Sequence, residues 1–327
     1  MSPMRYIVIG AGAVGGAIGG RLHQSGRDVV LVARGAHAAA LRAGGLRLTT
    51  PEGRVTLPVP VAESPEEVAP REGDVLILSV KTQDTQAALA TWAEAAGDLP
   101  LFTAQNGVAN EPMALRHFRR VHGVCVWLPS QFLEAGAVVA PCGPLTGILH
   151  LGRYPEGSVE GPVEGDETLR RVSEDLQDSH FGAPVVPDVM RWKYAKLLSN
   201  LGNALEALCG PVEGEARTSL FHRARDEGVA ALNAAGIPFT SSEEQAAARE
   251  GRMTYHDIPG AERGSSTWQS LRRGRSVEAD WLNGEVVLLG RRFGVPTPVN
   301  EALQRHATAA AHAGRPPGSL APEELGV

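Results

Sequence analysis

The sequence has few cysteines, few aromatic residues and no long apolar run, and these shortages exclude several classes of protein. Its three cysteines, Cys125, Cys142 and Cys209, show neither a CxxC pair nor a Cys/His ligand spacing, so neither a disulfide framework nor a metal site is predicted. The one stretch that resembles an anchor, Ile7–Gly20, is rich in glycine and shorter than the ~20 apolar residues that span a bilayer. We therefore expect a protein of the reducing cytoplasm without a membrane anchor.

Positive charge is also scarce. Lys and Arg number 31 against 37 Asp and Glu, which gives a formal net charge of −6. Surfaces that bind nucleic acid or anionic lipid usually carry an excess of positive charge, so neither is expected as the main partner. A small-molecule substrate is expected instead, and a homodimer stays an open alternative. The 327 residues, 43% of them hydrophobic, are enough for about two domains with a core each.

Short β-branched runs alternate with helical stretches in the first half of the chain. Tyr6–Ile9 and Asp28–Ala33 are predicted strands on either side of one helical stretch, and Asp74–Val80 and Leu101–Ala104 flank another, around Thr85–Ala96. A strand–helix–strand order needs a right-handed crossover and gives a parallel sheet. The pattern therefore predicts a doubly wound α/β domain.

From about residue 187 onward helical periodicity replaces the strands. We therefore predict a first domain over residues 1–186 and a second, mostly helical domain over residues 187–327. The first helix of the second domain is expected at about Asp188–Leu208, and a long helix at Val277–Phe293. The proline-rich end, about Gly314–Val327, is predicted to be loose.

A glycine motif joins the first predicted strand to the first predicted helix. Gly10, Gly12 and Gly15 form GxGxxG, in which the first glycine permits the turn, the second lets a pyrophosphate approach and the third allows close helix packing. The helix N-terminus would supply N–H groups and a partial positive charge to the phosphates. This context predicts dinucleotide binding, although a glycine turn without a ligand is the alternative.

The tip of the second strand carries arginine instead of the acid that usually holds the ribose hydroxyls of NAD. Here Arg34 follows the strand, and a guanidinium can grip a 2′-phosphate through two hydrogen bonds. The sequence therefore favours NADP(H) over NAD as the cofactor. The alternative is that Arg34 is a solvated loop residue.

Polar side chains recur on one face of the predicted Asp188–Leu208 helix. Lys196, Asn200 and Asn203 are spaced by four and three residues, so they share that face, and Glu278 stands near the start of the later long helix. Spacing alone leaves an alternative for each. Lys196, Asn200 and Asn203 could form a solvent-facing edge of the helix, and Glu278 could simply interact with the helix dipole.

Several motifs in sequence order together resemble the ketopantoate reductases (2-dehydropantoate 2-reductases), over almost the entire chain. They are the GxGxxG turn, Arg34, Ser79-Val80-Lys81, Gln105-Asn106-Gly107, Lys196-Leu-Leu-Ser-Asn200, and Ser265-Ser266 ahead of Glu278.

The resemblance implies a Rossmann-type domain that binds NADP(H), followed by a helical substrate and catalytic domain, with the active site in the cleft between them. It implies NADPH-dependent reduction of a 2-oxo acid, that of ketopantoate to pantoate in pantothenate biosynthesis. Lys196 would be the proton donor and Glu278 the carboxylate that orients the substrate hydroxyl. The implied substrate contacts are Asn106, Asn200, Asn203 and Ser266, and the implied cofactor contacts are Lys81 and, again, Asn106.

The chain departs from the family pattern at two places. Asn203 stands one position before the place of the family's second asparagine, which Ala204 occupies, and Trp127–Phe132 replaces a segment with Thr and a His-Ala pair. Another carbonyl or imine substrate is therefore an alternative, as is a catalytically silent NADP(H)-binding regulator. Lys193, one turn before Lys196, is the alternative proton donor, although its rotation on the helix predicts that Lys193→Ala is nearly silent.

Overall fold

The computed structural model describes residues 4–156 and 166–327 and divides the chain into two compact units. The first unit comprises Met1–Lys193 and Ser241–Ala261, and the second comprises Tyr194–Thr240 and Glu262–Val327. The chain thus crosses between units inside one helix, later than the predicted boundary at 186/187, and returns once to the first unit. In the part of the chain described, no helix is long and apolar enough to cross a membrane.

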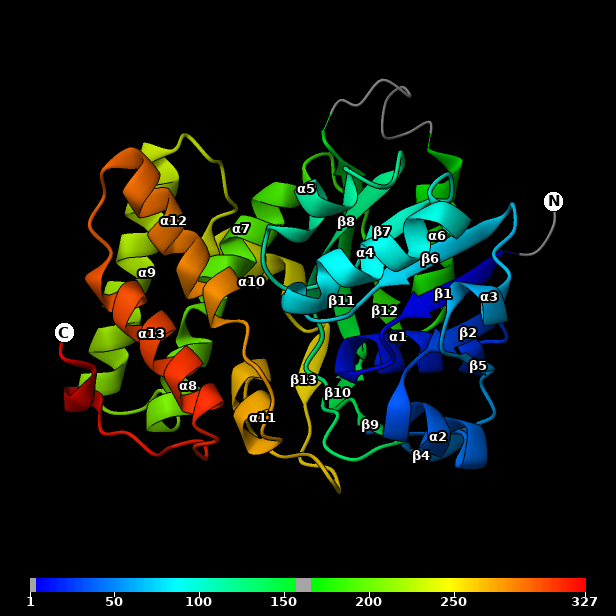
Figure 1. Ribbon diagram of the computed structural model, residues 1–327, viewed down its shortest axis with the longest axis horizontal. Helices are drawn as coiled ribbons and strands as arrows, with labels where there is room; N and C mark the ends of the chain where they lie inside the picture. The colour runs from blue at the N-terminus through cyan, green and yellow to red at the C-terminus, as the bar shows by residue number, and fades with distance from the viewer. Residues whose placement is uncertain (1–3, 157–165) are drawn as a thin grey trace. The chain divides into compact units, whose positions relative to one another are not determined.

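The first unit is built on an eight-stranded sheet of order β12-β11-β8-β7-β6-β1-β2-β5 (Figure 1). The predicted doubly wound parallel sheet is confirmed, because six neighbouring strands run parallel and only β11 opposes its neighbour β8. The strands are β1 (Arg5–Ile9), β2 (Asp28–Val32), β5 (Val61–Ala62), β6 (Asp74–Leu78), β7 (Leu101–Thr103), β8 (Val121–Trp127), β11 (Gly147–Tyr154) and β12 (Phe181–Gly182).

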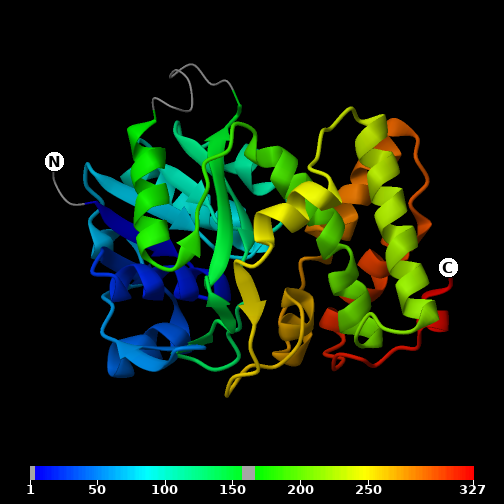
Figure 2. The same cartoon turned by 180° about the vertical axis from the view of Figure 1, so that it is seen from behind.

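Helices cover both faces of this sheet because successive strand side chains point to opposite sides. In β1, Tyr6 and Val8 belong to one core cluster and Ile7 and Ile9 to the other. The first cluster includes residues of α1 (Ala13–Gln24), α2 (Gly35–Gly44) and α6 (Glu167–Asp178), and the second those of α3 (Pro65–Val68) and α4 (Thr82–Ala96) together with Ala114 of α5 (Asn110–Ala114). Figure 2 shows α6, in green, in front of the sheet.

A small second sheet packs beside α1. It contains β4 (Gly53–Leu57), β3 (Leu46–Thr50) and β9 (Ala137–Val139), with β3 and β4 forming a hairpin. A Cβ at Gly16 of α1 would lie 2.7 Å from Val138 Cγ2, so this glycine allows β9 to approach the start of the helix.

The second unit is helical, as predicted. Its helices are the end of α7 (Val189–Asn200), α8 (Gly202–Cys209), α9 (Glu215–Ala234), α11 (Ser266–Arg272), the short 3₁₀ helix η2 (Ala279–Trp281), α12 (Asn283–Phe293), α13 (Pro298–His312) and the 3₁₀ helix η3 (Pro322–Leu325). Returning to the first unit, α10 (Ser242–Arg249) precedes β13 (Met253–Tyr255), which pairs with β10 (Cys142–Pro144). The expectation that strands end near residue 187 is therefore wrong for β13.

Three predicted details in the second unit are wrong. The helix expected at Asp188–Leu208 is two helices that meet at Leu201, whose carbonyl accepts a hydrogen bond from Asn283 Nδ2. The helix expected at Val277–Phe293 is interrupted at buried Leu282, where φ is −110° and ψ is −82°. The end of the chain is attached, because the N–H groups of Gly318 and Leu320 donate to carbonyls of α8 and Leu325 is buried.

Candidate active site

The glycine motif forms a tight turn between β1 and α1. Gly10 has φ +100° and Gly15 lies so close to the turn that a Cβ would come within 2.1 Å of the Gly10 carbonyl oxygen. At Gly12, by contrast, a Cβ would meet no atom within 4 Å. There is thus no room for a side chain at the first and third glycines of the turn. The space beside the second glycine is unoccupied, and a pyrophosphate would need to approach there.

The start of α1 suits an anion. Its N-cap residue, Gly12, provides no side-chain cap, and the first turn contains no acidic residue. The first N–H groups of a helix lack intrahelical partners and carry a partial positive charge. The turn and the helix together therefore fit the phosphates of a dinucleotide.

This geometry predicts opposite effects for two glycine substitutions. Gly12→Ala is expected to leave the free energy of unfolding nearly unchanged, since φ there is −73° and the space is open. The methyl group should nevertheless weaken dinucleotide binding by about tenfold, about 1.4 kcal/mol, because it occupies the phosphate approach. Gly15→Ala should lower the free energy of unfolding by roughly 1–3 kcal/mol through overpacking. Urea unfolding and equilibrium titration with NADPH would measure both, and equal dinucleotide affinity in Gly12→Ala would contradict the assignment.

Arg34 is exposed and follows β2 after one intervening residue, Ala33, as the N-cap residue of α2. Strands β1 and β2 are adjacent and parallel, so their carboxyl ends meet at one edge of the sheet. The Arg34 side chain therefore begins on the same edge as the glycine turn, where an adenosine ribose would be placed in a dinucleotide fold.

Two further loops at this edge are joined by buried and partly buried hydrogen bonds. Gln105 Nε2 donates to the Val80 carbonyl and to Thr85 Oγ1, each at 2.8 Å. Asn110 Nδ2 donates to the Asn106 carbonyl at 3.0 Å. The structure thus brings the turn before Lys81, the N-cap residue of α4, next to the loop that carries Asn106, and both side chains are partly buried.

Lys193 and Glu111 form a buried ion pair that the sequence did not predict. Their side chains are 2% and 0% exposed, and Lys193 Nζ lies 2.5 Å from Glu111 Oε1. The ammonium also donates to the carbonyls of Gln105, at 2.9 Å, and Val124, at 3.4 Å. An ammonium has three N–H donors, so these contacts leave none for a substrate and remove the case for Lys193 as the proton donor.

The same contacts contradict the basis for a silent Lys193→Ala variant. Rotation away from Lys196 places Lys193 inside the first unit rather than in solvent. The Lys193–Glu111 ion pair is hard to predict from the sequence, because a single charge in a helical stretch is usually solvated and Glu111 is far from Lys193 along the chain.

In the second unit, the end of α7 and the start of α8 carry the predicted polar residues. Asn200 is buried, whereas Lys196 and Asn203 are partly buried. Ser265 caps α11 and its Oγ donates to the Asn203 carbonyl at 3.3 Å, so the neighbouring Ser266 begins α11 close to Asn203. The Ser266 Oγ is buried without a hydrogen-bond partner among the described residues. A buried hydroxyl without a partner is uncommon and suits a ligand oxygen.

Glu278 is buried, 6% exposed, directly before η2. The segment it begins is tied to the junction of α7 and α8, since Asn283 Nδ2 donates to the Leu201 carbonyl at 3.2 Å. Asn200 and Glu278 thus belong to segments that this hydrogen bond joins.

Trp127, at the carboxyl end of β8, begins the segment that departs from the family pattern. The Arg249 guanidinium lies over its ring, 3.9 Å from the centroid. Nearby, the His150 ring stacks on Trp192 at 3.8 Å, and burial, followed by Arg252 and Arg249, lowers the pKa of His150 to about 4. This end of β8 is therefore aromatic and cationic, with a neutral histidine at physiological pH.

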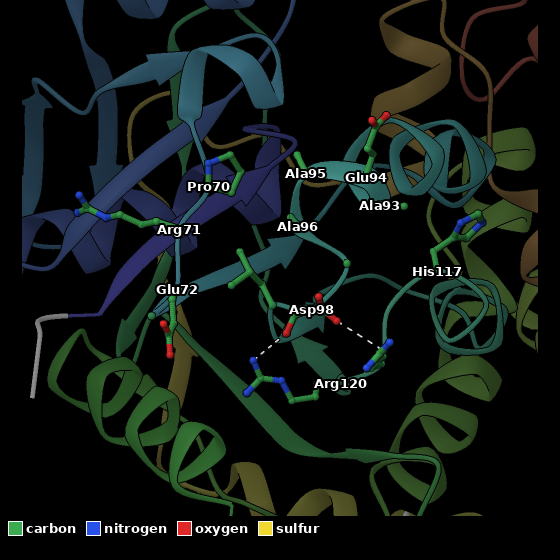
Figure 3. Close-up of a pocket in the computed structure, with 14 residues that line it drawn as sticks. Pro70, Arg71, Glu72, Ala93, Glu94, Ala95, Ala96, Asp98, His117 and Arg120 are labelled. Atoms are coloured by element: carbon green, nitrogen blue, oxygen red, sulfur yellow. Dashed lines mark hydrogen bonds and ion pairs between the residues drawn. The ribbon is translucent and has the colours of Figure 1, made fainter.

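A separate surface depression lies at the amino ends of β6, β7 and β8, formed by the segments that enter these strands (Figure 3). Arg119 and Arg120 there contact Asp98, and His117 lines the depression with Glu94. Ligands of doubly wound folds bind at the carboxyl ends of the strands, so this depression is not a candidate for the dinucleotide.

Comparisons with known proteins point to one family. Residues 6–155 match the family model described as ketopantoate reductase PanE/ApbA, and residues 188–311 match the model of its C-terminal part. A 2-dehydropantoate 2-reductase of Archaeoglobus fulgidus is 30% identical over 309 residues, which covers 93% of this chain and 96% of that protein.

Comparison with solved structures points to the same family. The crystal structure of a PanE/ApbA family ketopantoate reductase from Ralstonia eutropha JMP134 has a TM-score of 0.77 at 27% identity and covers 95% of this chain and 99% of that one. A D-mandelate dehydrogenase solved with NADH and anilino(oxo)acetate has a TM-score of 0.76 at 19% identity, over 99% of this chain and 100% of that one. This second likeness concerns the fold alone.

Proposed function

Because the chain belongs to the ketopantoate reductase family of oxidoreductases, we propose that it reduces a 2-oxo acid to a 2-hydroxy acid with NADPH, and that ketopantoate is the substrate. The observation that carries the proposal is the glycine turn, open at Gly12 and followed by an uncapped helix N-terminus. Residues 1–186 would bind the cofactor and residues 187–327 the substrate. Cys125, Cys142 and Cys209 are buried thiols outside any disulfide, and we propose that the enzyme works in the reducing cytoplasm.

The bound dinucleotide would supply the hydride, and the protein would supply orientation, a proton and charge stabilisation. Lys196 gives a proton to the oxygen of the reduced carbonyl, and Glu278 accepts a hydrogen bond from a substrate hydroxyl. The unpartnered Ser266 Oγ donates to the substrate carboxylate. Asn106, Asn200 and Asn203 contribute amide hydrogen bonds, and Lys81 and Asn106 contact the cofactor.

We further propose that Arg34 selects NADP(H) over NAD(H). Its exposed side chain at the end of β2 can form two charge-assisted hydrogen bonds with a 2′-phosphate. Arg34→Ala should therefore weaken NADPH binding roughly ten- to a hundredfold and leave NADH binding nearly unchanged. Equilibrium titration with both cofactors measures this, with Arg54→Ala, at an exposed arginine of the β3–β4 hairpin, as the control. Equal affinity of the unmodified protein for NADPH and NADH would rule the proposal out.

The test of the activity is a panel of 2-oxo acids, other ketones and imines, with NADPH consumption as the readout. We expect turnover of ketopantoate and related branched 2-oxo acids. The Trp127 and Arg249 pair supports the second candidate, a different carbonyl or imine substrate, because it places a bulky aromatic and cationic group at the end of β8. NADPH binding without turnover of any compound would instead indicate a silent regulator.

A further inference from the structure

His37 makes two hydrogen bonds to backbone groups, and together they define its protonation. Its Nδ1 accepts from the Gly136 N–H at 3.0 Å, and its Nε2 lies 2.7 Å from the Ala11 carbonyl oxygen. A carbonyl oxygen only accepts, so Nε2 carries a proton and Nδ1 does not. The ring is thus a neutral imidazole that links α2 to the glycine turn on one side and to the loop before β9 on the other.

The carbonyl that His37 holds belongs to the middle of the glycine motif. The Gly10 carbonyl accepts from Ser79 Oγ at 2.8 Å, and the Gly12 carbonyl accepts from the Gly16 N–H at 2.8 Å. His37 supplies the remaining partner, at Ala11. Three successive carbonyls of the turn are therefore each held by a different element.

Holding the Ala11 oxygen also determines the direction of an N–H group. The peptide between Ala11 and Gly12 is planar, and in a trans peptide the C=O and N–H point in opposite directions. With the oxygen held by His37, the Gly12 N–H points away from that ring, at the residue that begins α1. Gly12 lacks a Cβ, so nothing in its own side chain prevents this peptide from rotating.

We propose that His37 is a positioning residue for the dinucleotide, which acts by fixing the orientation of the Ala11–Gly12 peptide at the N-terminus of α1. The proposal rests on the dinucleotide site inferred above and concerns a residue outside the GxGxxG motif. Phe132 supports the ring from one side, with centroids 4.3 Å apart, so the unusual Trp127–Phe132 segment contributes to the cofactor turn through His37.

Three substitutions separate the two hydrogen bonds. The His37→Gln variant keeps the hydrogen bond to Ala11, because its side-chain amide N–H can still reach the Ala11 carbonyl. The His37→Asn variant loses that bond and keeps only the one from Gly136, because its shorter side chain places an acceptor oxygen near the Gly136 N–H. His37→Ala loses both. We expect the Kd for NADPH, measured at equilibrium without substrate, to rise about three- to tenfold in the Ala and Asn variants and to stay within about twofold in the Gln variant. His117→Ala, at the amino ends of the strands, is the control (Figure 3).

The result that overturns the proposal is an unchanged Kd in His37→Ala, or a raised Kd in the Gln variant with a normal one in the Asn variant. Urea unfolding of each variant distinguishes a general loss of stability from a specific loss of affinity. The measurement involves no turnover, so it holds whichever carbonyl compound is reduced. If the unmodified protein binds no dinucleotide, the proposed function fails instead.

Discussion

Lys196→Ala is expected to lower kcat for 2-oxo acid reduction by about 10²–10⁴-fold, the usual cost of removing a positioned general acid. The affinity for NADPH should stay nearly unchanged, because the ammonium would act at the reacting carbonyl and not at the phosphates. Lys193 cannot replace it, since its three N–H groups are directed at Glu111 and two carbonyls. Steady-state kinetics and a separate NADPH titration measure the two quantities.

Two variants complete this experiment. Ser199→Ala changes an exposed residue on the same helix and should keep normal kinetics. Glu278→Ala should raise KM and lower kcat together, because its carboxylate would hold the substrate hydroxyl in the ground state as well as in the transition state. Full activity of Lys196→Ala on the best substrate would end the lysine-acid mechanism, while the family assignment would stand.

The sequence predicts well those elements that depend on a local pattern of residue types and spacing. The β1 strand, the glycine turn and α1 follow from a short apolar run, three glycines and helical spacing, all within about twenty residues. The faces of the sheet follow as well, because Ile7 and Val8 must point to opposite sides of a strand. Residue types and spacing are sufficient for such features.

The features that sequence missed depend on contacts between distant residues. The break at Leu201 coincides with a hydrogen bond from Asn283, and the end of the chain is held by carbonyls of α8. His37 gave no signal either, since a histidine after Arg34 resembles any polar residue in a helical turn. Its function depends on Ala11 and Gly136, which only the folded chain brings to it.

The Lys193–Glu111 pair is expected to have the largest effect on stability. Lys193→Ala leaves the Glu111 carboxylate, 0% exposed, without its cation, and breaking a buried pair from one side typically costs about 3–5 kcal/mol. The Gln105 carbonyl also loses a donor, so the loop of Asn106 should loosen. Urea unfolding should therefore show a much lower midpoint, in contrast to the nearly normal midpoint expected for Lys196→Ala.

A double variant separates the effect of the buried charge on stability from the effect of side-chain packing. If an uncompensated carboxylate causes the loss, Lys193→Met combined with Glu111→Gln should be more stable than Lys193→Met alone, because no buried charge remains. Thr103 Oγ1, which donates to Glu111 Oε1 at 2.6 Å, can donate equally to the glutamine carbonyl. As a control, Arg47→Ala breaks the exposed pair with Glu134 and should change the free energy of unfolding by at most about 1 kcal/mol. If Lys193→Ala unfolds like the control, the buried pair contributes no more than a surface contact, and the hydrogen bonds of Gln105 and Asn110 are enough to hold the loop of Asn106.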